Sequence, residues 1–144
     1  MLSLPLEEPE LKFRPWVLWS NRSDLVDPPD DCEDGSDYPG LYILGHFKSA
    51  PHPSSPAIAS GKQTVYIGQT KNIRNRPIRC HNKRTLYSEK YADWSLRHLY
   101  VAIWDIAQWF DVSEPQKAFL AYAEKKLIWE YARRWGCRPP LNLR

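Results

Sequence analysis

The sequence predicts an α+β fold built on a small, mostly antiparallel sheet. Two short segments rich in β-branched and aromatic residues, 38–47 and 64–70, flank a loop and form a hairpin pattern. A third such segment occupies 96–106, and an apolar periodicity typical of a helix follows at 114–135. With 144 residues, the chain has the size of one domain, and its elements run strand, strand, helix, strand, helix.

The segments around the hairpin complete the predicted sheet. Residues 11–20 are apolar enough for one edge strand, because Pro15 keeps this strand out of the sheet interior. Residues 21–38 are rich in Asp, Pro and Ser and are expected to form a loop. Residues 48–62 hold three prolines and four serines, which predicts a long surface loop inside the hairpin.

Two helices are expected in the basic and C-terminal parts of the chain. Within the basic segment 71–90, Pro77 predicts that a helix begins near residue 77. Arg76 is then expected just before the first turn of that helix. Residues 113–116, Ser-Glu-Pro-Gln, form a capping-box pattern with proline in the first turn. The long helix that follows is predicted to stop at Gly136.

Charge is distributed unevenly along the chain, whose net charge is +3. Residues 1–40 carry ten acids and three bases, whereas residues 41–144 carry seventeen bases and seven acids. A basic body of this kind favours a polyanionic partner, most often nucleic acid; a solvated basic face without a partner is the alternative. The densest stretch, VYIGQTKNIRNRPIRCHNKR (65–84), contains no acid, and its candidate phosphate contacts are Lys71, Arg74, Arg79, Lys83 and Arg84.

Several other classes of protein are disfavoured. No run approaches the roughly 18 apolar residues that a membrane helix needs, and the N-terminus lacks a signal-peptide pattern, so we expect a cytoplasmic protein without membrane contact. Cys32, Cys80 and Cys137 are odd in number and far apart. They predict reduced thiols rather than a disulfide framework or a zinc site.

Glu124 is the misfit of the long helix. It lies four residues after Leu120 and three before Leu127, which places a carboxylate with the apolar stripe. Such a carboxylate is expected to be paired with an arginine, to lie at the edge of the stripe, or to bind a metal. In the last case a hard ion such as Mg²⁺ would take oxygen ligands, and Arg76 could hold a phosphate as a fork.

Two tyrosines and one histidine are further candidates. Tyr42 and Tyr66 each lie two residues from a glycine, Gly40 and Gly68, within a predicted strand. They are either core tyrosines of the sheet or a pair of phenols that meet near a water or a phosphate. His81 could act as a general base near neutral pH, contact a phosphate, or have no role.

The two hairpin strands resemble the signature strands of the GIY-YIG endonucleases. The resemblance is carried by PGLYIL (39–44), in which Tyr42 takes the place of the first motif's tyrosine, and by VYIG (65–68), in which Tyr66 and Gly68 match the second motif. Arg76 follows Tyr66 by ten residues, where the family's catalytic arginine is expected.

The C-terminal part extends this resemblance over residues 38–144. Glu124, in AEKKLIWEY, resembles the family's metal-binding glutamate on the last long helix. Asn142, in RPPLN, resembles the asparagine that follows that helix. The resemblance implies an N-terminal extension with an acidic loop (1–37) before a nuclease domain (38–144), whose mainly three-stranded antiparallel sheet is flanked by helices.

The resemblance also implies a reaction. Members of this family hydrolyse nucleic-acid phosphodiester bonds with a single divalent metal, here Mg²⁺ or Mn²⁺. By this analogy Glu124 binds the metal, Arg76 steadies the scissile phosphate, and one of Tyr42, Tyr66 and His81 orients or deprotonates the attacking water. Gly40, Gly68 and Asn142 would shape the site.

Three functions stay open at this point. The first is a DNA endonuclease, in restriction or phage defence, repair or a mobile element; the second is an RNA endonuclease with the same site. The third is a nucleic-acid-binding subunit on a nuclease-like fold. Trp129, which points away from the apolar stripe, and the N-terminal tryptophans Trp16 and Trp19 suggest a second packing layer or an interface. Such an interface would serve a homodimer or a partner protein.

Overall fold

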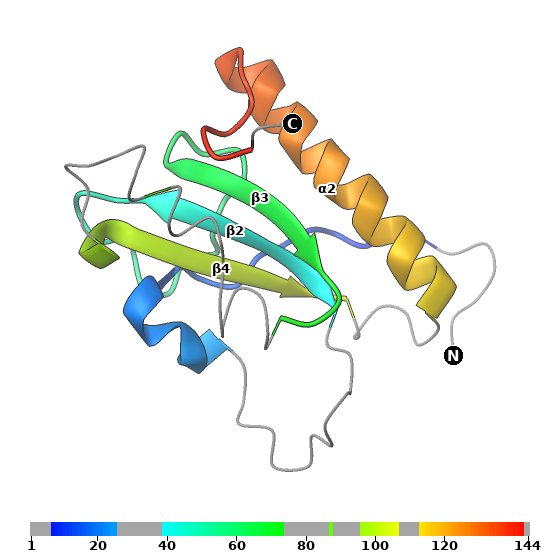
Figure 1. Cartoon of the computed structure of the whole chain (residues 1–144), viewed down its shortest axis with the longest axis horizontal. Helices are drawn as coiled ribbons and strands as arrows, with labels where there is room; N and C mark the ends of the chain where they lie inside the picture. The colour runs from blue at the N-terminus through cyan, green and yellow to red at the C-terminus, as the bar shows by residue number, and fades with distance from the viewer. Residues whose placement is uncertain (1–6, 26–38, 74–86, 88–95, 107–112, 143–144) are drawn as a thin grey trace.

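A computed structural model describes residues 7–25, 39–73, 87, 96–106 and 113–142, and Figure 1 shows their arrangement. Its sheet has four antiparallel strands in the order β1-β4-β2-β3. These strands are β1 (Val17–Leu18), β2 (Gly40–His46), β3 (Thr64–Thr70) and β4 (Leu99–Asp105). The α+β architecture and the antiparallel sheet are thus confirmed.

The number of strands differs from the three that the resemblance implied. Val17 and Leu18 pair with Val101 and Tyr100 and add a fourth strand beside β4. This strand has only two residues and lies at the sheet edge, as Pro15 predicted. Pro15 itself forms an isolated bridge with Pro56 in the long hairpin loop.

The β2–β3 hairpin contains one irregularity that matters for the site. Pairing is regular from Gly40↔Thr70 to Leu44↔Tyr66, and the next pair is Gly45↔Thr64. Val65 is therefore an extra residue on β3, which is the arrangement of a β-bulge. Val65 and Tyr66 consequently belong to the same side of the sheet, where both contact one apolar cluster.

The two faces of the sheet are covered by different elements. Helix α2 (Ser113–Trp135) packs on the face that carries Leu41, Ile43 and Ile67. The opposite face carries Tyr42 and other alternate residues of β2 and β4, and it packs against the 3₁₀ segment η1 (Trp19–Leu25). Figure 1 shows α2 alongside β3 and η1 beside β4, at opposite sides of the sheet.

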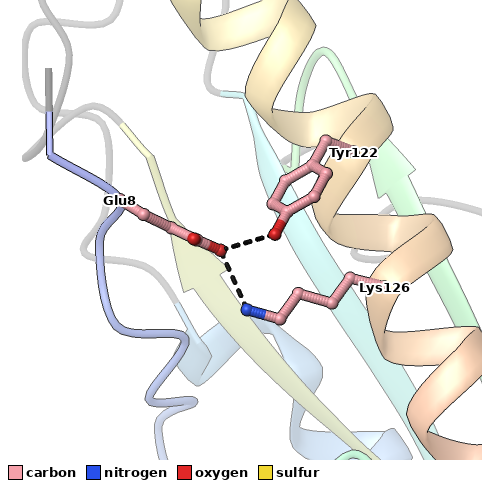
Figure 2. A network of polar contacts seen from close by, with 3 residues as sticks. All are labelled: Glu8, Tyr122 and Lys126. Carbon is pink, nitrogen blue, oxygen red and sulfur yellow. Dashed lines mark hydrogen bonds and ion pairs between the residues drawn. The ribbon is translucent and has the colours of Figure 1, made fainter. Parts of the chain in front are cut away.

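The N-terminal segment belongs to the same packed structure. Phe13 is 2% exposed and lies in the core on the α2 side of the sheet. Glu8 accepts hydrogen bonds from Tyr122 Oη and Lys126 Nζ, both at 2.9 Å, and so connects this segment to α2 (Figure 2). These two donors lower the pKa of Glu8. Residues 7–25 therefore share a core with the region 38–144.

The long helix agrees with its predicted bounds. Gly136 follows Trp135 with φ of +82°, a conformation that favours glycine, and its N–H donates to the carbonyl of Ala132 at 2.7 Å. Trp129 is 63% exposed, as its position off the apolar stripe predicted. Neither α2 nor any other described helix combines the length and apolar character needed to cross a membrane.

The remaining predictions concern other segments. Strand β4 is preceded by a short 3₁₀ segment, η3 (Leu96–His98), so the predicted strand 96–106 begins later than expected. Cys137 is an exposed free thiol. The helix start predicted near residue 77, Cys32 and Cys80 lie outside the described residues.

Candidate active site

Tyr42 and Tyr66 meet above Gly68. Tyr42 on β2 is the direct cross-strand partner of Gly68 on β3, and the two tyrosine ring centroids lie 5.7 Å apart. A Cβ atom at position 68 would lie 2.6 Å from Tyr66 Cε2 and 2.9 Å from Tyr42 Oη. Glycine at position 68 therefore creates the space that both rings occupy. Tyr42 is 2% exposed, whereas Tyr66 is only partly buried.

Glu124 lies where α2 meets the free edge of β3. It is partly buried, and the side-chain and backbone amide groups of Gln69 lie close enough to its carboxyl to lower the pKa of that group. Because β3 is the edge strand beside α2, its outward backbone groups are turned toward this side of the sheet. Burial raises the pKa of the Glu124 carboxyl, and the Gln69 donors and the charge of Lys125 oppose this effect. Glu124 thus lies at the border between the buried and the exposed side of α2.

Asn142 occupies the neighbouring part of the same edge. Its Nδ2 donates to the carbonyl of Ile67 at 2.8 Å, and its Oδ1 accepts from the Ile67 N–H at 2.9 Å. The N–H of Leu141 donates to the carbonyl of Val65 at 2.8 Å. The segment after α2 thus covers the edge of β3 as a short additional strand would.

Four predicted site residues lie along residues 66–69 of β3, with the two tyrosines on the face opposite α2 and Glu124 on the side of α2. Tyr66 is itself the first of these residues, and Ile67 binds Asn142. Gly68 lies under the ring of Tyr42, and Gln69 lies beside Glu124. The four side chains come from β2, β3, α2 and the C-terminal segment, so the fold rather than the local sequence assembles them.

Gly40 serves packing at the start of β2. A Cβ atom there would overlap Ile73 Cδ1 and would lie 2.5 Å from the carbonyl oxygen of Trp104. Gly40 precedes Tyr42 by two residues, so the close approach of these neighbours fixes the strand that carries the tyrosine. Its contribution is therefore to the position of β2.

A basic pocket opens beside Gln69. It has a volume of about 380 Å³ and lies between the end of β3 and the first turns of α2, where Lys71, Lys117 and Leu120 line it. Lys71 is exposed, as expected for a phosphate contact. The other predicted basic and catalytic residues lie outside the described residues: Arg74, Arg76, Arg79, His81, Lys83 and Arg84.

The site offers one carboxylate to a divalent metal. In the described ranges, no three His, Cys, Asp or Glu side chains gather into a group that could hold an ion. Magnesium, however, is commonly bound by one or two carboxylates, with water and substrate phosphate as the remaining ligands. Glu124, oriented by Gln69 and next to a basic pocket, provides one such carboxylate.

Sequence reasoning missed two features. Gln69 was not a candidate, because its role depends on β3 being the edge strand beside α2. The buried pair His46 and Tyr87, with Nδ1 and Oη 2.7 Å apart, joins residues separated by 41 positions, and no local pattern indicates it. Burial, followed by the charges of His98 and Lys48, lowers the pKa of His46 to about 4.

Comparison with protein-family models, curated proteins and solved structures found no match to this chain. The candidate function is therefore drawn from the residues and the geometry described above.

Proposed function

We propose that this chain is a metal-dependent endonuclease that hydrolyses phosphodiester bonds of nucleic acid, with DNA as its leading substrate. The observation that carries this proposal is the convergence of Tyr42, Tyr66, Glu124 and Asn142 on four consecutive residues of β3. The carboxylate of Glu124, which suits Mg²⁺ or Mn²⁺, lies beside Gln69, the residue that follows the glycine packed against both tyrosine rings. The resemblance of the hairpin strands to the GIY-YIG endonucleases supports the same reading.

The burial of the tyrosines suggests different roles for them. In this proposal Tyr66, which is partly exposed, orients the attacking water or a phosphate oxygen through its hydroxyl. Tyr42 is 2% exposed, so its role is to hold the ring of Tyr66 in position. This division assigns the contact with substrate to Tyr66 and a positioning role to Tyr42.

Gln69 and Asn142 hold the remaining parts of the site. The amide groups of Gln69 lie beside the Glu124 carboxylate and favour its charged form. The amide of Asn142 fixes the backbone of Ile67, which separates Tyr66 from Gly68. A metal bound at Glu124 would supply Lewis-acid stabilisation of the charge on the phosphate.

Positive charge supports the binding of a polyanionic substrate. Lys71 and Lys117 line the pocket beside Gln69, and the basic stretch 71–84 follows directly along the chain. In this proposal Arg76 takes the scissile phosphate as a fork. Such contacts give affinity without reading the base sequence.

Cleavage of two substrates in parallel tests this function. Supercoiled plasmid and a structured RNA are incubated with the purified protein and Mg²⁺ or Mn²⁺, beside Arg76→Ala and a chelator control. We expect metal-dependent nicking of the plasmid that Arg76→Ala abolishes. Cleavage of RNA alone would show that the protein is an RNA endonuclease. Salt-sensitive binding without cleavage of either substrate would replace the nuclease by a nucleic-acid-binding subunit.

A further inference from the structure

A second basic pocket lies at the opposite end of β3 from Gln69. Its volume is about 470 Å³. The polar and charged side chains that line it come from the end of β2 and from the loop before β3: His46, Lys48, Ser49, Lys62 and Gln63. None of the described residues that line this pocket is Asp or Glu. The pocket therefore presents cations and hydrogen-bond donors without a neutralising carboxylate in its wall.

Each lysine of this pocket has a neighbour that places it. Lys62 Nζ lies 5.9 Å from the ring centroid of Trp135, whose Nε1 donates to the carbonyl of Ser60 at 2.8 Å. Lys48 lies near enough to His46 that its charge contributes to the lowered pKa of that ring. His46 is neutral near pH 7 because of this lowered pKa, so Lys48 and Lys62 supply the positive charge that an anion in the pocket would meet.

The pocket opens on the face of the sheet that carries the two tyrosines. His46 follows Tyr42 by four residues on β2, so both side chains point to the same face, about 13 Å apart along the strand. On β3 the pocket is lined by Val65, which directly precedes Tyr66 on the same face because of the bulge. A nucleic-acid strand advances about 3.4 Å per nucleotide along the helix axis, so the pocket lies within a few nucleotides of both tyrosines.

We propose that this pocket binds a backbone phosphate of the nucleic-acid strand that passes over Tyr66, with Lys48 and Lys62 as the phosphate contacts. This inference rests on the function proposed above. It adds a contact a few nucleotides from the reacting phosphate, so that the substrate is held on both sides of residues 66–69: here, and at the Lys71 pocket. The contact would set the position of the strand without selecting a base sequence.

Salt dependence of binding tests this site without cleavage. Affinity for a short labelled DNA duplex is measured by fluorescence anisotropy in chelator over a range of salt concentrations. We expect Lys48→Ala and Lys62→Ala each to reduce the slope of log affinity against log salt by about one. Lys12→Ala, an exposed lysine on the N-terminal segment, removes the same charge and should leave the slope unchanged.

The outcomes separate this inference from the nuclease proposal. If both variants keep the wild-type slope while the duplex is bound, the phosphate site is wrong and the nuclease proposal is unaffected. If both slopes fall and the wild-type protein still cleaves neither plasmid nor RNA, the phosphate site stands and the nuclease proposal fails. A wild-type protein that binds no duplex would overturn the phosphate site.

Discussion

The side-chain amide of Asn142 makes both of its hydrogen bonds to one residue, Ile67, at 2.8 and 2.9 Å. Ile67 lies on the edge strand, and its backbone groups on the outer side would otherwise need water as partners. A single side chain therefore closes the sheet edge at the centre of the candidate site.

Replacement of Asn142 should destabilise the fold. Asn142→Ala removes both hydrogen bonds, and Asn142→Asp replaces the donor by a charged acceptor that faces the Ile67 carbonyl. We expect either variant to lower the free energy of unfolding by about 1–3 kcal/mol, as measured by urea denaturation. Asn21→Ala, on the exposed surface of η1, is the matched control. Equal free energies of unfolding for Asn142→Ala and Asn21→Ala would show that the hydrogen bonds of Asn142 do not stabilise the fold.

A side chain at position 68 should displace the tyrosines. The Cβ of Gly68→Ala would lie within 3.0 Å of both rings, and such overpacking costs about 1–3 kcal/mol. The cost should be smaller when Tyr66→Ala has already removed one ring. A double-mutant cycle in urea measures this coupling. Additive effects of the two substitutions would be inconsistent with the close packing of position 68 and Tyr66.

Loss of the Gln69 side chain should change the pH dependence of cleavage. The Gln69 donors oppose the burial that raises the pKa of Glu124, and Gln69→Leu removes the side-chain donor. The carboxyl pKa should rise further, so the acidic limb of the rate profile should move to higher pH, because a metal ligand must be deprotonated. The Mg²⁺ concentration for half-maximal rate should rise about tenfold. If the acidic limb of the Gln69→Leu rate profile is unchanged, Gln69 does not affect the protonation of Glu124 during cleavage.

His46 should make the fold sensitive to acid. Its pKa is lowered from 6.5 to about 4, so between these values the unfolded chain binds the proton more strongly than the folded chain. The contribution of neutral His46 to the free energy of unfolding is fully present above pH 6.5. It should fall by about 2–3 kcal/mol as the pH approaches 4. Burial lowers the pKa most, and among the described residues His98 and Lys48 lower it further by charge, while Tyr87 Oη forms a hydrogen bond with the ring.

Paired variants isolate this effect from other titrating groups. His46→Gln should lose this part of the pH dependence, whereas His52→Gln, an exposed histidine of the hairpin loop, should retain it. The measurement is the free energy of unfolding across this pH range. A His46→Gln profile that runs parallel to the wild-type profile would exclude His46 as the source.

The sequence predicts the elements of this fold better than their pairing. Runs of β-branched and aromatic residues indicate β2 and β3, Pro15 indicates an edge strand, and Gly136 marks the end of α2, because each of these signals acts locally. The bulge at Val65 depends on which residues pair across the hairpin, and a single sequence does not contain that register.

In the candidate site, too, local motifs indicate some residues, whereas other contacts depend on tertiary packing. Tyr42, Tyr66 and Gly68 were found through their motif, and the strand pairing explains why the glycine is needed. The placement of Glu124 against Gln69 depends on how α2 lies along β3, which periodicity alone does not determine. The contact between His46 and Tyr87 is similarly a product of tertiary packing.

The most direct test of the central claim compares two glutamates of α2. Glu124→Gln keeps the shape of the side chain and removes its charge, and Glu130→Gln makes the same change at a partly buried position two turns away. The measurement is the rate of Mg²⁺-dependent plasmid nicking by each purified protein. The proposal predicts that Glu124→Gln falls to the rate without protein and that Glu130→Gln nicks as the wild type does. Wild-type nicking by Glu124→Gln would contradict it.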